Sequence, residues 1–310
     1  MNVTVTGAAG TIGLACVHML VRAGHRARAF VRRTEEFRRV CREDRVEVVE
    51  GDILDRAAVA TALEATDAVI HCVDFPPSRF SLNFDALQHV LGALGTGRQL
   101  IYPGNVWVYG PPESERVGPD HPKASPARLG QVKADLEKAI TAEWGTVVHL
   151  PDVYGPGVVK GRLHAMFDRA LAGKTVFIPG DLDRPQESLY IEDAARALIA
   201  PLGRPKARGA DYTAGSAPIT PRDLAALVFK NAGRPQRLRS IPIGLWRSIA
   251  LLQPDRRAMR DLSYLYECST LLDGSLIRRD LGWMPEVNYA DGVRRTVRWL
   301  RTLAHTSRYN

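Results

Sequence analysis

Apolar residues recur at two spacings along the chain, and the way these spacings alternate predicts the fold. Short runs rich in β-forming residues predict strands at residues 2–6, 26–31, 46–50, 67–72, 99–103 and 146–150. Helical spacing predicts helices between them, near residues 12–23, 35–41, 56–64, 80–94 and 126–142. Strands that alternate with helices over short connections form a parallel sheet covered on both faces. The pattern therefore predicts an α/β fold with a doubly wound parallel sheet of the Rossmann type.

A glycine-rich turn joins the first predicted strand to the first predicted helix. Gly7 permits the tight turn, Gly10 lets the backbone approach a pyrophosphate, and Gly13 lets the helix pack against the strand. Free N–H groups and the helix dipole at this terminus favour a negatively charged ligand. An ordinary strand–helix turn is the alternative interpretation. We expect a dinucleotide to be bound here by Gly7, Ala9, Gly10, Thr11, Ile12 and Gly13.

The second half of the chain has a less regular pattern. Helices are predicted near residues 160–172, 221–231, 244–252, 274–281 and 289–304, and residues 188–191 are predicted to form a short strand before a helix from Glu192. We assign residues 1–150, with the strand and helix near 187–201, to a dinucleotide-binding domain. Residues 151–310 are then mainly a smaller C-terminal lobe that binds the substrate.

The end of the second predicted strand indicates which dinucleotide is bound. A site for the unphosphorylated cofactor usually has an acidic residue about 20 residues after the glycines, where it binds the ribose 2′-hydroxyl. Arg32 and Arg33 stand there instead, and a guanidinium suits a 2′-phosphate by its charge and paired donors. We therefore favour NADP(H) over NAD(H), with two solvated surface arginines as the alternative.

Composition narrows the classes of partner. The net charge of +8 is spread over many arginines, and no helix-turn-helix, zinc-finger or RNA-binding signature accompanies it, so we expect no nucleic-acid partner. The four cysteines lack metal-ligand spacing and indicate a reducing compartment, so we expect no metal. No apolar run approaches the about 18 residues of a membrane span, and no signal peptide is recognisable. We expect a soluble, cytoplasmic protein.

Several motifs together resemble the extended and atypical short-chain dehydrogenase/reductase superfamily, whose members include NAD(P)-dependent epimerases and dehydratases. Besides the glycine turn, the matching segments are Gly51-Asp52-Ile53-Leu54-Asp55, Ala68-Val69-Ile70-His71-Cys72, Val108-Tyr109-Gly110, Leu150-Pro151-Asp152-Val153-Tyr154-Gly155-Pro156 and Leu281-Gly282-Trp283-Met284-Pro285. The resemblance implies that Asp52 and Ile53 hold the adenine, and that Cys72, Pro151 and Val153 lie along the rest of the cofactor. It also implies a homodimer built on the helices near 80–94 and 126–142.

The chain departs from this superfamily at its catalytic positions. The superfamily's proton donor is a Tyr four residues before a Lys that binds the nicotinamide ribose, and this spacing puts both side chains on one helix face. Alignment on Lys133 puts Leu129 at the tyrosine position, and alignment on residues 108–110 puts Asn105 at the Ser/Thr position. Lys133 is therefore expected to bind cofactor and act in catalysis, and Asn105 can still hydrogen-bond a carbonyl. For Lys133 the alternative is a solvated charge.

A carbonyl reduction would then need another proton donor, since a positioned general acid contributes about 10²–10⁴-fold. The candidates are Tyr109, Asp74, Tyr102, Asp152 and His121, and among these we select Asp74 and Tyr109. Asp74 follows the fourth predicted strand, on the ligand side of the sheet. The alternatives are a loop Asp that caps the next turn and a packing Tyr.

These expectations favour an NADP(H)-dependent oxidoreductase or epimerase-like enzyme with a non-standard proton donor. The place of an Arg-Asp pair in members that act on nucleotide sugars reads Glu187-Ser188, so we expect a smaller or more apolar carbonyl or hydroxyl substrate. We expect Trp246, Tyr264, Tyr266 and Trp283 to line its pocket, with packing in the core as the alternative for these aromatic residues. Two alternatives stay open: a cofactor-binding enzyme with non-redox chemistry (isomerase, cyclase or lyase), and a non-catalytic NADP(H) sensor.

Overall fold

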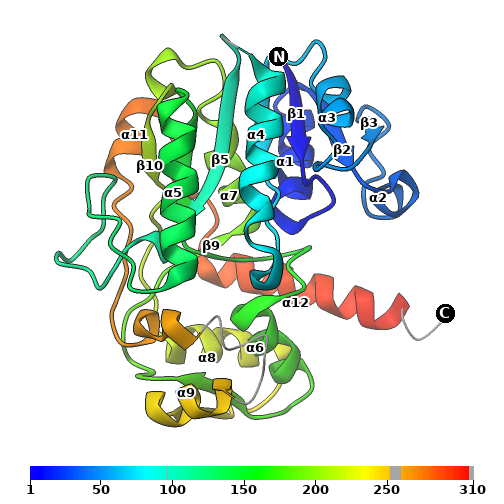
Figure 1. Cartoon of the computed structure of the whole chain (residues 1–310). Helices are drawn as coiled ribbons and strands as arrows, with labels where there is room; N and C mark the ends of the chain where they lie inside the picture. The colour runs from blue at the N-terminus through cyan, green and yellow to red at the C-terminus, as the bar shows by residue number, and fades with distance from the viewer. Residues whose placement is uncertain (96, 252–259, 307–310) are drawn as a thin grey trace.

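The computed structural model describes residues 1–95, 97–251 and 260–306, and in these residues seven parallel strands form the main sheet. Their order across the sheet is β10-β6-β5-β4-β1-β2-β3 (Figure 1). The strands are β1 (Asn2–Thr6), β2 (Arg26–Val31), β3 (Glu47–Glu50), β4 (Ala68–His71), β5 (Gln99–Asn105), β6 (Thr146–Leu150) and β10 (Asp211–Thr213). The strand order reverses between β1 and β4, and ligands of such sheets bind beyond the carboxyl ends of the strands at this switch point.

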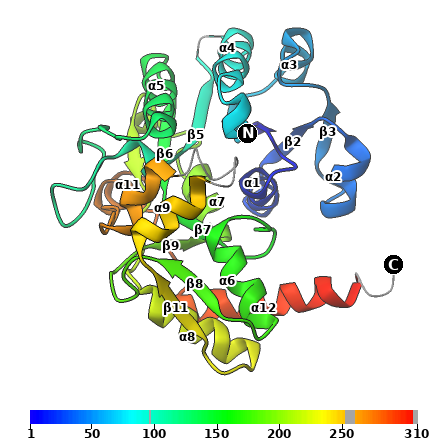
Figure 2. The same ribbon diagram turned by 60° about the horizontal axis from the view of Figure 1, so that its bottom comes forward.

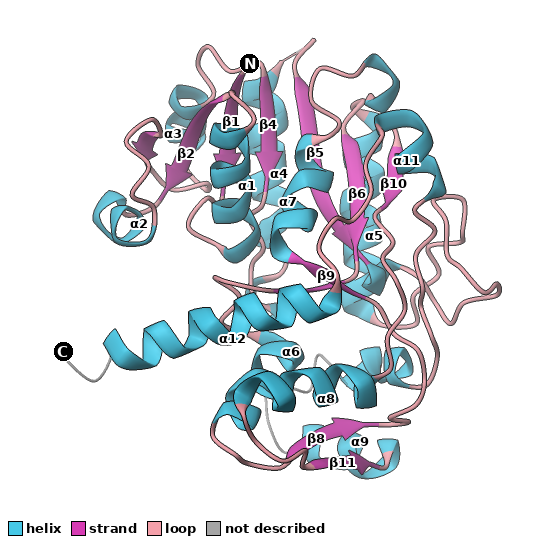
Figure 3. Ribbon diagram, turned by 180° about the vertical axis from the view of Figure 1, so that it is seen from behind, coloured by secondary structure: helices cyan, strands magenta, loops and turns pink. Residues whose placement is uncertain are grey.

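Helices cover both faces of the sheet, which confirms the predicted doubly wound architecture. One face carries α3 (Arg56–Ala62), α4 (Leu82–Leu94) and α5 (Arg128–Ala142), of which α4 and α5 lie in front of the sheet in Figure 1. Figure 3, seen from behind, shows α1 and α7 on the other face. The helices of that face are α1 (Thr11–Arg22), α2 (Thr34–Val40), α7 (Ile191–Ile199) and α11 (Ser275–Leu281).

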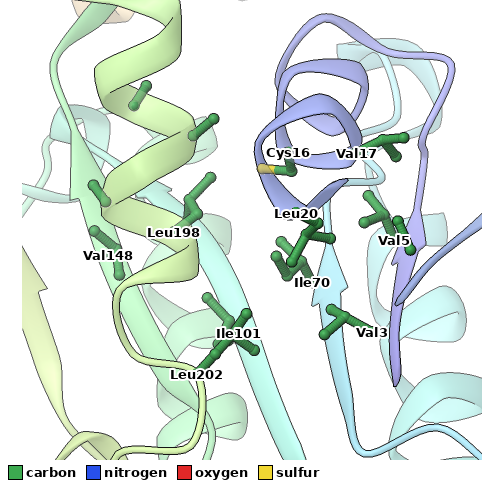
Figure 4. Packing of buried hydrophobic residues seen from close by; sticks show 14 of the residues in the cluster. Val3, Val5, Cys16, Val17, Leu20, Ile70, Ile101, Val148, Leu198 and Leu202 are labelled. Carbon is green, nitrogen blue, oxygen red and sulfur yellow. The ribbon is translucent and has the colours of Figure 1, made fainter. Parts of the chain in front are cut away.

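Branched aliphatic side chains on the strands hold these helices in place. Val3 and Val5 of β1 are fully buried, because one face of this central strand is covered by α1. Figure 4 shows Val17 and Leu20 of α1 close to them. The same cluster continues under α7, through Leu198. Full burial of each such side chain contributes roughly 1.5–3 kcal/mol, so this layer fixes the position of the glycine turn that begins α1.

A second core organises the smaller lobe, which lies below the carboxyl ends of the strands in Figures 2 and 3. Phe167 of α6 and Phe229 of α8 are buried in it, together with Val297 of α12. Its elements are α6 (Gly161–Leu171), α8 (Pro221–Ala232), α9 (Ile243–Leu251), α12 (Tyr289–Thr306), and the parallel pairs β7 (Asp152–Tyr154) with β9 (Ser188–Tyr190) and β8 (Val176–Pro179) with β11 (Leu238–Ile241).

The structure differs from the sequence-based expectations mainly in its shortest elements. The strand expected at 188–191 forms as β9 but pairs with β7, and the segment that returns the chain to the main sheet is β10. Four strands (β7, β8, β10 and β11) were not predicted, nor were the short 3-10 helices η1 (Pro77–Arg79), η2 (Val106–Val108), η3 (Pro205–Ala207) and η4 (Asp261–Tyr266). Residue 252, at the end of one predicted helix, lies outside the described residues.

Candidate active site

The glycine turn lies at the switch point of the sheet, where it packs against the chain that leaves β4. Gly7 has a φ of +67°, and a Cβ built on it would lie 2.8 Å from the carbonyl carbon of Cys72. A Cβ on Gly13 would lie 2.3 Å from the carbonyl oxygen of Gly7. Side chains are therefore excluded at both positions, which keeps the turn tight and its backbone accessible, as a dinucleotide site requires.

The N-terminus of α1 offers its backbone donors to a ligand. Gly10 is the N-cap residue and provides no side-chain cap, while Ala9 and Gly10 are exposed. The Thr11 hydroxyl donates to the carbonyl of Gly157 at 3.2 Å, so it ties this terminus to the smaller lobe instead of capping the helix. The first N–H groups of a helix have no intrahelical partner, and here they are free to bind an anion such as a pyrophosphate.

The residues expected at the adenosine end lie at the same edge of the sheet. Arg32 and Arg33 are exposed directly after β2, and the Arg33 guanidinium pairs with Glu36 one turn along α2. Asp52 follows β3, where its carboxylate accepts a hydrogen bond from the Leu54 N–H at 2.9 Å. Ile53 is buried beneath it. These positions are compatible with an adenosine end that carries a 2′-phosphate and with one that lacks it.

Lys133 is a buried cation held by several contacts near this edge. Its ammonium donates to Asp74 Oδ1 at 2.8 Å and to the Tyr102 hydroxyl at 3.0 Å, and it lies 5.3 Å from the centre of the Phe80 ring. Burial alone would lower the pKa of Lys133, but its contacts with Tyr102 and Asp74 outweigh burial and raise it. Lys133 is 3% exposed whereas the Asp74 side chain is 50% exposed, so within this pair the carboxylate is the group that solvent reaches.

Two buried rings support the lysine from the strand side. His71, the last residue of β4, stacks on Tyr102 with 6.1 Å between ring centres, and its Nδ1 lies 2.7 Å from the Thr6 hydroxyl. Burial, together with the charge of Lys133, lowers the pKa of His71 to about 4, so its ring is neutral at neutral pH. Burial raises the pKa of Tyr102, which keeps its hydroxyl protonated. Lys133 is thus the single positive charge of this group.

The sequence alignment put Leu129 at the tyrosine position and Asn105 at the serine position. In the structure the first side chain packs in the interior and the second caps a short helix. Leu129 is buried in an apolar cluster with Phe80, Leu262 and Tyr264. Asn105 ends β5, and its side-chain oxygen accepts from the Trp107 N–H at 2.9 Å, which caps η2. Its amide nitrogen forms no hydrogen bond with the residues that the structure describes, so both of its N–H donors are available to another group.

Tyr109 lies away from the cofactor edge, beside a buried charged cluster. Its ring packs on His149 and His121, with 5.1 and 5.8 Å between ring centres, and burial raises the pKa of its hydroxyl. The cluster consists of Lys123, Glu137, His149 and Asp211. Tyr109 therefore packs the sheet edge, and its expected role as a proton donor has no geometric support.

The loop 111–127 spans from this charged cluster to the smaller lobe. Lys123 lies 2.9 Å from Glu137 Oε2 and 2.5 Å from Asp211 Oδ2. At its other end Arg116 donates to Glu187 at 3.2 Å, and Val117 forms a bridge to Leu272. The loop is thereby attached to both lobes.

A cavity of about 380 Å³ opens between the lobes and adjoins the cofactor edge. Its walls include four residues expected to hold the cofactor, namely Thr11, Ile12, Pro151 and Val153. Lys133, Asn105, Tyr109 and Asp74 do not line it. The alternative donor Asp152 does, and its carboxylate pairs with Arg162.

The aromatic residues expected around the substrate divide into two groups. Trp246 and Tyr266 line the cavity and meet edge to face, with 5.4 Å between ring centres. For Tyr264 and Trp283 the expectation was wrong, because Tyr264 is buried in the cluster around Leu129 and Trp283 in the core under α7. Both form part of the packing that supports the site from outside.

Sequence reasoning did not identify Lys160, Arg162 or Glu187 as charged residues of the cavity wall. Arg162 begins α6 and donates to Gln186 Oε1 at 2.5 Å, besides its pair with Asp152. Glu187 is buried; burial raises its pKa to about 7, although the Leu272 N–H at 3.1 Å and Arg116 oppose this shift. No motif marks Arg162, and Glu187 was noted only as a departure from the nucleotide-sugar pattern. The contacts of Arg162 with Gln186 and of Glu187 with Arg116 join segments that are distant in sequence.

Within the described residues, no group of three or more His, Cys, Asp or Glu side chains is arranged to hold a metal ion. Among the helices formed by these residues, none is long and apolar enough to cross a membrane.

Comparison with known proteins agrees with this geometry. The model of the NAD dependent epimerase/dehydratase family matches residues 3–215. UDP-glucose 4-epimerase of Mycolicibacterium smegmatis is 27% identical over 340 residues, covering 97% of this chain and 99% of that protein. Sterol demethylase protein B of Methylococcus capsulatus is 26% identical over 328 residues, covering 94% and 97%.

A solved structure shows the same fold. UDP-glucuronic acid 4-epimerase from Bacillus cereus in complex with NAD superposes with a TM-score of 0.81 at 20% identity, covering 98% of this chain and 99% of that one. The family match extends from β1, through the glycine turn and the helix that carries Lys133, to the segment after β10. The chain therefore belongs to the NAD dependent epimerase/dehydratase family.

Proposed function

We propose that the protein is an NADP(H)-dependent oxidoreductase or epimerase-type enzyme in which Asp74, held by Lys133, handles the substrate proton. The observation that carries this proposal is the 2.8 Å contact between Lys133 Nζ and the half-exposed Asp74 carboxylate. Of the sequence-predicted catalytic side chains, Asp74 combines an ionisable oxygen with exposure at the end of β4. Leu129 has no proton to give.

The chain's residues fit a nicotinamide dinucleotide, because the glycine turn excludes side chains and α1 leaves its first N–H groups free. When bound, this cofactor supplies hydride transfer. Asp74 accepts the hydroxyl proton of a substrate that is being oxidised and returns it in the reverse reaction. Lys133 keeps Asp74 oriented and binds the ribose hydroxyls, while Asn105 donates its amide hydrogens to the substrate oxygen.

The preference for NADP(H) rests on Arg32. This side chain is exposed at the end of β2 and forms no ion pair with the residues that the structure describes, so it is free to meet a 2′-phosphate. Arg33 is partly engaged, since it pairs with Glu36. A guanidinium binds a phosphate through parallel charge-assisted hydrogen bonds.

A small, largely apolar substrate fits the cavity. Besides Trp246 and Tyr266, its walls carry a third aromatic residue, Trp107, and the aliphatic residues Val106, Val158, Leu163, Leu262 and Leu265. Relatives of similar identity include both a UDP-glucose epimerase and a protein named for sterol demethylation, so sugar nucleotides are not a necessary assumption. We further propose a homodimer across α4 and α5, which lie side by side on one face (Figure 1).

Calorimetry with NADPH and NADH, followed by a substrate screen at the nicotinamide absorbance band, tests this function. The proposal expects NADPH to bind and a small ketone or alcohol to change the band. Asp74→Asn should then lower turnover at least about 10²-fold with nucleotide binding retained. Asp85→Asn, an exposed residue of α4, is the matched control. Full turnover by Asp74→Asn would exclude this base.

A second candidate is a protein that binds the nucleotide and does not pass hydride to a substrate. The observation that favours it is that Lys133, Asp74 and Asn105 do not line the cavity, while Leu129 is sealed in an apolar cluster. Conversion of a substrate with an unchanged nicotinamide band would identify non-redox chemistry. Nucleotide binding without any conversion would identify a sensor.

A further inference from the structure

The lining of the cavity between the lobes combines positive and aromatic side chains. Its wall at the start of α6 carries Lys160 and Arg162. Trp246 of α9 and Tyr266 of η4, packed edge to face at an angle of 61°, also line it, and the Tyr266 ring lies next to the Arg162 guanidinium. Aliphatic residues contribute much of the remaining lining. A lining of this kind suits a ligand with an apolar ring and an anionic group close to it.

Arg162 is held in one orientation at the polar end. Its Nε donates to Asp152, its Nη1 donates to Gln186 Oε1 at 2.5 Å, and its guanidinium carbon lies 5.9 Å from the centre of the Tyr266 ring. Among the described residues, no hydrogen bond is formed by Nη2. The side chain remains 33% exposed. A fixed guanidinium with a spare donor at a cavity wall binds an anionic oxygen at a small entropic cost.

The balance of charge at this wall favours one negative charge on the ligand. Asp152 offsets Arg162, and Glu187 is paired with Arg116 while its side chain is fully buried. Lys160 is exposed and forms no ion pair within the described part of the chain, so the wall keeps one uncompensated cation. The first N–H groups of α6 add to it, because Lys160, the N-cap residue, gives no side-chain cap.

We propose that the cavity binds a compact aromatic acid, with its carboxylate on Arg162 and Lys160 and its ring against Trp246 and Tyr266. As a substrate assignment this rests on the proposed function, since the same molecule then carries the hydroxyl or carbonyl that reacts. A volume of about 380 Å³ lies at the lower end for ligand pockets and matches two or three fused or linked rings. A nucleoside diphosphate carries more negative charge than the single spare cation can offset.

Binding of 2-naphthoate, measured by isothermal titration calorimetry and by quenching of tryptophan fluorescence, tests the proposal. 2-Naphthalenemethanol is the neutral probe of the same ring size, and UDP is the diphosphate probe. We expect the naphthoate to bind more tightly than either. Arg162→Met should weaken naphthoate binding about tenfold or more and change binding of the alcohol less than about twofold. Trp246→Ala should weaken both.

Arg239→Met is the matched control, because it removes the same charge from an exposed position on β11 of the same lobe and should change nothing. Tighter binding of UDP, or equal naphthoate affinity in Arg162→Met and the wild type, would overturn the proposal. Trp246→Ala keeps the proposal testable if Arg162→Met does not fold. If the protein binds nucleotide but not naphthoate, only this inference is contradicted. If it binds naphthoate but no nucleotide, the proposed function is contradicted.

Discussion

Gly130 of α5 touches the backbone of Trp107, because a Cβ at this glycine would lie 2.0 Å from the Trp107 carbonyl oxygen and 2.1 Å from Ser125 Oγ. The absence of a side chain lets α5 approach η2 closely. Lys133 lies three residues further along α5, so this contact fixes the position of the helix backbone from which the Lys133 ammonium reaches Asp74. The close approach is thus a condition for the geometry of the site.

Gly130→Ala should destabilise the protein by at least about 2 kcal/mol through overpacking. A loss of stability would distinguish this contact, because replacing Gly by Ala within a helix normally raises the free energy of unfolding by about 0.5–1 kcal/mol. Gly92→Ala in α4 is the control that should show this gain, since its nearest neighbour is an arginine side-chain nitrogen 4.0 Å away. Urea denaturation of both variants measures the difference, and two gains would contradict the contact.

Lys133→Met should weaken NADPH binding at least about tenfold, because a charged hydrogen-bond donor to the ribose is lost. The half-exposed Asp74 carboxylate regains water in this variant, so the fold should persist. Lys138→Met removes an exposed lysine from the same helix and should bind NADPH like the wild type. Calorimetric titration measures the affinity of each variant for NADPH. Equal affinities of Lys133→Met and Lys138→Met would contradict a cofactor role for Lys133.

Arg32→Asp should weaken NADPH binding far more than NADH binding, by at least about a factor of ten in the ratio. The carboxylate repels a 2′-phosphate and is able to accept from a 2′-hydroxyl. Arg39→Asp changes the charge of α2 by the same amount at an exposed position beyond the expected phosphate. Parallel titrations with both nucleotides check this, and equal losses would remove the assignment.

His71 should make stability depend on pH in the acid range. Its folded pKa is lowered from 6.5 to about 4, so above pH 6.5 both states carry a neutral ring and the full contribution is present. As the pH falls from 6.5 to about 4, the unfolded state takes up the proton first and stability is lost. The loss is about 3 kcal/mol.

His71→Asn tests this dependence, since an amide is able to replace Nδ1 toward Thr6 but does not titrate. Its free energy of unfolding should change less between pH 7 and pH 4 than that of the wild type. Denaturant titrations at a series of pH values provide the comparison. Parallel pH profiles would mean that another group titrates.

Most of the main sheet could be predicted because short β-forming runs alternate with helical patterns along the chain. β1 and β2 were predicted to the residue, since β1 ends at a glycine turn and β2 at Arg32, which mark where each strand stops. β7 and β10 were missed because three residues are too few to show a period. Their pairing is decided by neighbours about 40 to 60 residues away.

The site was predictable where one segment carries the chemistry. The glycine turn and Lys133 lie within recognisable motifs, and Asp74 was selected because it follows a strand on the ligand side. The pairing of Lys133 with Tyr102 and of Arg162 with Asp152 depends on how the connections pack. Tyr102 was a candidate proton donor from its sequence, but its contact with Lys133 could not be predicted before α5 was placed over β5.

The loop 111–127 has a mechanical consequence for the site. Glu137, which anchors this loop through Lys123, lies one helical turn after Lys133 on the same face of α5. At the other end of the loop, Arg116 donates to Glu187 and to the Leu272 carbonyl. One connection therefore holds both the helix that carries the Lys133 ammonium and the part of the cavity lining to which Glu187 belongs.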